Sequence, residues 1–129
     1  MFGKKVYNKL VRDKIPQIIT DQGGVCKVER VDSDERCVKL LDKLLEEAAE
    51  VREAGCKAYL YSHDPGSQND AFDSAKNEVI EELADIKEVI RNIEMWFDIQ
   101  PATVDTVRIQ KLKDKGGFDA GKVLKWVMK

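Results

Sequence analysis

Hydrophobic residues recur every three or four positions along most of the chain, which is the pattern of amphipathic helices. The first long stripe consists of Cys37, Leu40, Leu41, Leu44, Leu45, Ala48 and Val51. Gly55, Ala58 and Tyr59 continue it, so we expect this helix to extend to about residue 60. A second long stripe consists of Phe72, Val79, Ile80, Leu83, Ile86, Ile90, Ile93 and Phe97. The pattern therefore predicts two long helices.

Residues 62–70 separate the two predicted helices and are the one clear loop of the sequence. They contain Asp64-Pro65-Gly66, the strongest turn signal in the chain. A turn at this point would make the two helices antiparallel neighbours. We therefore expect a helical bundle built on a long antiparallel hairpin.

Shorter elements are predicted on both sides of this hairpin. Residues 7–22 begin with basic side chains and become helical, and Gly23-Gly24 ends that helix. Residues 102–114 carry a weaker apolar stripe and predict a last helix. Residues 25–31 are β-branched, and we expect them to pair with residues 122–127, because a lone strand is not stable. The predicted fold is mainly α, with a small two-stranded β element.

Composition narrows the class of protein. A length of 129 residues predicts a single domain, residues 1–129. The formal net charge of −2 gives no field that would attract a nucleic acid polymer. Three cysteines without a C-x-x-C pair fit a reducing compartment. No apolar run is long enough to span a membrane, and no signal-peptide core is present, so we expect a cytoplasmic protein without a membrane partner.

Two acidic clusters lie on the two predicted long helices. The first contains Glu46, Glu47 and Glu50, and the second contains Glu82 and Asp85. Residues three apart are neighbours on a helix surface, so each cluster presents a pair of carboxylates. Positions 47 and 85, and likewise positions 50 and 82, are equidistant from residue 66 in the turn. Because both arms of a hairpin rise by about 1.5 Å per residue, the pairs are predicted to meet at the same height.

Acidic runs are most often the solvated faces of amphipathic helices. Helical wheels favour another interpretation here, because Glu82 falls within the apolar arc of its helix and Glu47 borders that of the other. A carboxylate among apolar neighbours is costly unless it is paired or binds a cation. Four such groups suit Mg²⁺, with Mn²⁺ as an alternative. Glu78 is a candidate ligand for a second ion, whereas Glu81 and Glu88 face outward.

The two clusters resemble the E-E-x-x-E…E-x-x-D signature of the all-α nucleoside triphosphate pyrophosphohydrolase superfamily, which includes the MazG-like enzymes. The segment Lys9-Leu10-Val11-Arg12-Asp13-Lys14-Ile15-Pro16 is similar to the start of its phosphoribosyl-ATP-pyrophosphohydrolase-like branch. Gly116-Gly117-Phe118 resembles a segment near the end of that branch. The 31 residues between Glu50 and Glu82 exceed the usual gap, so residues 56–72 are a candidate insertion that alters the pocket.

This resemblance implies Mg²⁺-dependent hydrolysis of nucleoside triphosphates between the α and β phosphates, in house-cleaning of nucleotide pools. By motif position, the metal ligands would be Glu47, Glu50, Glu82 and Asp85. One of these glutamates, or Glu46, would hold or deprotonate the attacking water. The candidate cations for the triphosphate are Lys9, Arg12, Lys14, Lys111, Lys113 and Lys115. Ordinary surface charge explains these basic residues equally well.

Two other functions stay open from the sequence alone. One is the phosphoribosyl-ATP pyrophosphohydrolase of histidine synthesis, and the other is a non-catalytic helical module that binds a nucleotide or a protein. A single hairpin also leaves apolar residues such as Trp96 and Phe97 without a partner. We therefore expect a homodimer or a higher homo-oligomer, with a bundle core completed across subunits.

Overall fold

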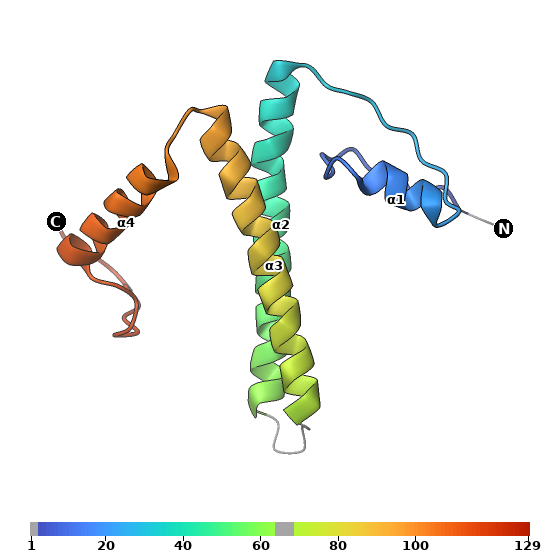
Figure 1. The fold of residues 1–129 in the computed structure, drawn as a ribbon. Helices are drawn as coiled ribbons and strands as arrows, with labels where there is room; N and C mark the ends of the chain where they lie inside the picture. The colour runs from blue at the N-terminus through green and yellow to red at the C-terminus, as the bar shows by residue number, and fades with distance from the viewer. Residues whose placement is uncertain (1–2, 64–68) are drawn as a thin grey trace.

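A computed structural model describes residues 3–63 and 69–129, and this part of the chain forms four helices. They are α1 (Ile15–Asp21), α2 (Ser33–His63), α3 (Asn69–Trp96) and α4 (Pro101–Lys115). The helices α2 and α3 pack along each other as a hairpin, while α1 and α4 lie on opposite sides of it (Figure 1). The prediction of a mainly helical bundle is confirmed. The predicted turn Asp64-Pro65-Gly66 lies outside the described residues.

The helix ends coincide with signals in the sequence. Before α2, the side chain of Asp32 accepts a hydrogen bond from the backbone N–H of Glu35 at 2.8 Å, which satisfies a donor in the first turn. Pro101 opens α4, where its missing N–H costs nothing. Gly116 ends α4 with a φ of 80°, and its N–H donates to the carbonyl of Leu112 at 2.9 Å.

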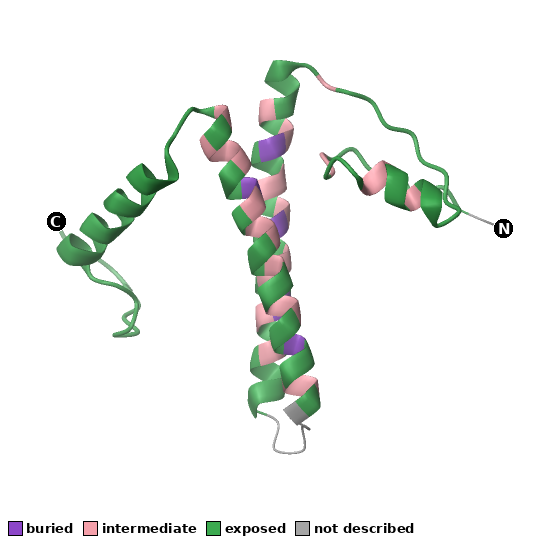
Figure 2. Ribbon diagram, viewed as in Figure 1, coloured by how far each residue is buried: buried purple, intermediate pink, exposed green. Residues whose placement is uncertain are grey.

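The core is a single narrow seam between α2 and α3 (Figure 2). Its buried hydrophobic residues, within the described ranges, are Leu40, Ala54, Ala75 and Val89. Glu47 is also buried, with 6% of its surface exposed, whereas Leu45 of the predicted apolar stripe is 71% exposed. Leu40, Glu47 and Ala54 are spaced by seven residues, the repeat of two helices packed side by side. A carboxylate therefore occupies a position of the seam that is normally apolar.

The predicted two-stranded β element is wrong for the described residues, none of which forms a strand. Residues 25–31 and 122–127 lie on opposite sides of the hairpin, so they cannot pair within one copy of the chain (Figure 1). Val25 is 98% exposed and Trp126 is 74% exposed. β-Branched and aromatic residues favour a strand only when a neighbouring strand packs against them.

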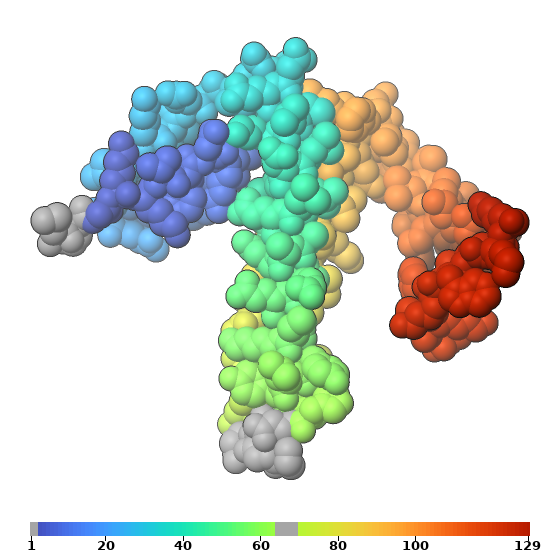
Figure 3. All heavy atoms as spheres, turned by 180° about the vertical axis from the view of Figure 1, so that it is seen from behind, coloured from blue at the N-terminus to red at the C-terminus, as the bar shows by residue number. Residues whose placement is uncertain are grey.

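The helix α4 and the residues after it form an arm that extends away from the hairpin (Figure 3). The exposed large hydrophobic residues of this arm include Val104, Val107, Ile109, Leu112, Phe118, Leu124 and Trp126. The arm therefore presents apolar side chains to solvent within one copy of the chain. Among the described helices, none is both long enough and apolar enough to cross a membrane.

Candidate metal centre

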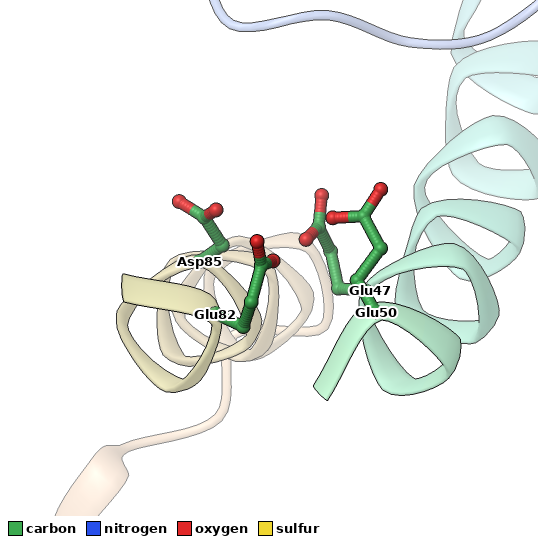
Figure 4. A group of neighbouring side chains, drawn as sticks. All are labelled: Glu47, Glu50, Glu82 and Asp85. Carbon is green, nitrogen blue, oxygen red and sulfur yellow. The ribbon is translucent and has the colours of Figure 1, made fainter. Parts of the chain in front are cut away.

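Four carboxylates converge on one side of the hairpin (Figure 4). Glu47 and Glu50 come from α2, and Glu82 and Asp85 come from α3. One oxygen from each of the four lies within 4.8 Å of the chosen oxygens of the other three. The spacing of three residues on each helix and the matching heights on the two arms account for this meeting. The structure thus brings together the four carboxylates that the sequence singled out.

Two oxygens of this group are buried and lack a hydrogen-bond donor among the described residues. They are Oε2 of Glu47 and Oε2 of Glu82. Leaving a buried acceptor unsatisfied costs about 1–3 kcal/mol, and more when it carries charge. A divalent cation would satisfy both oxygens, and carboxylate oxygens are the ligands that Mg²⁺ and Mn²⁺ prefer. The residues present therefore fit such an ion.

The titration behaviour of the cluster also reflects crowded negative charge. Burial raises the pKa of Glu47 above its ordinary value of 4.5, and the nearby charge of Glu50 adds to the rise, while Lys43 opposes it. Burial also raises the pKa of Glu50, and the neighbouring carboxylate of Glu82 raises it further. Both glutamates would be ionised more readily with an added positive charge between the helices.

Lys43 lies at the edge of the cluster and is not one of the residues predicted from the sequence. Its Nζ is 3.3 Å from Oε1 of Glu46 and 3.3 Å from Oε1 of Glu47, and its side chain is 16% exposed. The available signal was its position three and four residues before these glutamates on the same helix. Lys43 offsets part of the negative charge but leaves Oε2 of Glu47 without a donor.

The N-terminal segment 8–12, which we call the strap, reaches the same side of the hairpin. Lys9 Nζ lies 2.9 Å from Oε1 of Glu46, and Arg12 Nη2 lies 2.7 Å from Oδ1 of Asp85. Figure 4 shows the N-terminal chain, in pale blue, passing on the side to which the carboxylates point. Two of the predicted phosphate-binding cations are therefore beside the cluster.

Glu46 lies next to the four carboxylates but is held differently. Burial raises the pKa of Glu46, but hydrogen bonds from Lys9 and Lys43 outweigh this effect and hold the pKa below 4.5. Its carboxylate is thus an anion with two lysine partners. Glu46, the predicted candidate for holding or deprotonating the attacking water, is therefore a neighbour of the four-carboxylate group and not a member of it.

Glu78, the predicted extra metal ligand, forms hydrogen bonds through both oxygens with Lys57 Nζ, at 3.0 and 3.2 Å. It lies in an open groove of about 410 Å³ that adjoins the cluster. The groove is lined by Glu50, Glu53, Ala54, Lys57, Glu78 and Glu82. The structure therefore places Glu78 near the four carboxylates but gives it a lysine partner.

The remaining predicted phosphate-binding cations are not brought to the cluster within one copy of the chain. Lys14 is the N-cap residue of α1 and joins none of the ion pairs between described residues. Lys111, Lys113 and Lys115 lie on α4, in the arm that extends away from the hairpin (Figure 1). Lys9 and Arg12 are the predicted cations that the structure places at the site.

Comparisons with protein-family models, with curated proteins and with solved structures gave no significant match. The fold and the site define a helical-hairpin protein with a four-carboxylate candidate metal centre.

Proposed function

We propose that the protein is a Mg²⁺-dependent hydrolase that cleaves a nucleoside triphosphate or a related nucleotide between the α and β phosphates. The products would be the monophosphate and pyrophosphate, and the role would be cleansing of nucleotide pools. The observation that carries this proposal is the meeting of four carboxylate oxygens from two helices within 4.8 Å. The similarity of the acidic clusters and the N-terminal segment to the pyrophosphohydrolase superfamily supports the same reaction.

The side chains of this site have separate roles in the proposed reaction. The four carboxylates of the cluster would hold Mg²⁺, with Glu47 and Glu50 from α2 facing Glu82 and Asp85 from α3. The chemistry that Mg²⁺ supplies when bound is neutralisation of phosphate charge and acidification of water. Arg12 would bind phosphate oxygens, because its planar guanidinium matches them in a bidentate manner. In the hydrolysis, a water oxygen forms a bond to one of the two phosphorus atoms, the bridging P–O bond between the α and β phosphates breaks, and the proton of the water passes to a base such as Glu46 or solvent.

The test is a pyrophosphate-release screen over canonical nucleotides, damaged nucleotides and phosphoribosyl-ATP, with and without Mg²⁺. We expect release that requires Mg²⁺ and that falls by about 10²–10³-fold in Glu82→Gln and in Asp85→Asn, the usual loss when one electrostatic group is removed. Glu81→Gln is the matched control, because Glu81 is an exposed carboxylate on the same helix. Its activity should equal that of the wild type.

Other outcomes of this screen would identify a different function. Turnover of phosphoribosyl-ATP alone would assign the protein to histidine synthesis. Nucleotide binding without turnover, with an affinity that tolerates Glu82→Gln and Asp85→Asn, would contradict the enzyme proposal. That result would indicate a non-catalytic helical module.

A further inference from the structure

The strap is fixed to the hairpin at three points. Lys39 Nζ donates a hydrogen bond to the backbone carbonyl of Asn8 at 2.8 Å. Lys9 and Arg12 then each bind a carboxylate of the hairpin through a side-chain ion pair. The bond from Lys39 holds the backbone and involves no carboxylate. If one of the two ion pairs opens, two of the three contacts between the strap and the hairpin are left.

The two ion pairs of the strap differ in their relation to the cluster. Lys9 binds Glu46, which lies outside the four-carboxylate group and has Lys43 as a second partner. Arg12 binds Oδ1 of Asp85, which is one of the four carboxylates. A cation held by the cluster therefore competes with Arg12 for the same carboxylate. It does not compete in this way with Lys9.

We propose that Arg12 is a phosphate-binding residue that a divalent cation releases from Asp85. Without the cation, Arg12 offsets part of the charge of the cluster. With the cation bound to Asp85, the two positive groups repel each other, and the guanidinium moves to the phosphate chain of the substrate. This inference rests on the proposed metal-dependent function and names how one residue of the site is regulated.

Because the ion pair between Arg12 and Asp85 is exposed to water, breaking it costs little free energy. The Arg12 side chain is 57% exposed and the Asp85 side chain is 39% exposed. Ion pairs that are this accessible to water contribute little to stability, because water screens them. A phosphate group offers the guanidinium two oxygens in the geometry that it prefers. The exchange also makes phosphate recognition depend on prior metal binding.

The first test compares the affinity for Mn²⁺, measured by electron paramagnetic resonance of the free ion, in full-length variants. Arg12→Ala should bind Mn²⁺ about twofold to fivefold more tightly than the wild type, the fold-change that a surface ion pair accounts for. Lys9→Ala is the matched control from the same strap, since Glu46 keeps Lys43. It should change the affinity much less than Arg12→Ala does.

The second test follows the side-chain ¹⁵N resonance of Arg12 in the wild-type protein, assigned by its absence in Arg12→Lys. Saturating Mg²⁺ should move this resonance toward that of free arginine. Inorganic tripolyphosphate, a phosphate chain without a base, should then move it again, and only when Mg²⁺ is present. Because this measurement is made on the wild type, it does not depend on the folding of Arg12→Ala.

The results separate this inference from the proposed function. If Mn²⁺ binds but Arg12→Ala leaves its affinity unchanged, the exchange is contradicted while the proposed metal centre is supported. The same holds if Mg²⁺ does not shift the Arg12 resonance. Tripolyphosphate that shifts the resonance equally without Mg²⁺ would also contradict the exchange. If the wild type binds no Mn²⁺, both proposals fail.

Discussion

Burial and neighbouring negative charge act together on Glu50. Burial raises its pKa and the carboxylates of Glu82 and Glu46 raise it further, while a hydrogen bond with Glu47 opposes the rise. In a helix pair without ligands, such a cluster lowers stability, because the unfolded chain keeps the same carboxylates apart in water. The four-carboxylate cluster is therefore better explained by a function than by a contribution to the stability of the fold.

Glu50→Gln should stabilise the protein in the absence of divalent cations. Removing one of the crowded charges should raise the free energy of unfolding by about 1 kcal/mol, a typical size for a single substitution. With saturating Mg²⁺ the order should reverse, because the wild type gains stability from binding and the variant loses a ligand. Thermal unfolding with EDTA and with Mg²⁺ measures both effects. Glu81→Gln should show neither effect. Destabilisation of Glu50→Gln in EDTA would contradict the placement of Glu50 among crowded negative charges.

The raised pKa values of Glu47 and Glu50 also predict a pH dependence of stability. Between 4.5 and the raised values the folded state binds more protons than the unfolded state, so the free energy of unfolding falls as the pH rises. Urea unfolding in EDTA should therefore give a lower stability at pH 8 than at pH 5, with a smaller difference in Glu50→Gln. Mg²⁺ at pH 8 should restore the loss. A wild-type stability that rises over this interval would contradict the prediction.

The hairpin is the element that positions the site, and its seam is closely packed at Ala75, which is 1% exposed. Ala75→Leu would add three carbon atoms where no space is available, so we expect a loss of about 1–3 kcal/mol in the free energy of unfolding. Ala84→Leu is the matched control, since Ala84 is exposed on the same helix. Urea unfolding of both variants tests this packing. Equal stability of the two variants would contradict it.

Local signals in the sequence predicted much of this element. The two apolar stripes and the spacing of three residues within each acidic pair each depend on neighbours in the chain. The heights of the two acidic pairs followed from one regular geometry, that of the α-helix. Such features can be derived before any tertiary contact is known.

Features that join distant segments could not be derived in this way. Arg12 and Asp85 are 73 positions apart, and no spacing rule relates them. The predicted pairing of residues 25–31 with 122–127 failed because composition indicates a preference for extended backbone but does not supply a partner. Lys43 was missed for another reason: its spacing was visible, but charged residues on helices are commonly solvated.

The whole molecule exposes much more surface than its mass requires. The chain has an accessible area of 11738 Å² at 14.7 kDa, whereas a compact monomer of this mass exposes about 6,900 Å². The excess accessible area falls within the range that obligate interfaces bury, and the lower end of that range is about 2,000 Å². Exposed large hydrophobic residues of the α4 arm include Val104, Phe118 and Trp126. The arm extends away from the hairpin (Figure 3). We propose that copies of the chain cover this arm for one another.

Light scattering at micromolar concentration should therefore give a mass at least twice the 14.7 kDa of one chain. Val104→Asp combined with Val107→Asp should lower that mass, because it places charges among exposed apolar side chains of α4. Thr106→Asp is the control, since it adds a charge at an exposed polar position of the same helix. A wild-type monomer at this concentration would contradict the proposed assembly.

The narrow seam between α2 and α3 has a kinetic consequence. Folding of one copy alone gains little free energy from burial, because few hydrophobic residues of the described chain are buried. They are Leu40, Ala54, Ala75 and Val89. Association of copies would then be a step of folding. Refolding should therefore follow second-order kinetics and become slower on dilution. For such a protein, dilution lowers the fraction of folded chains, so a melting temperature has meaning only when the protein concentration is stated.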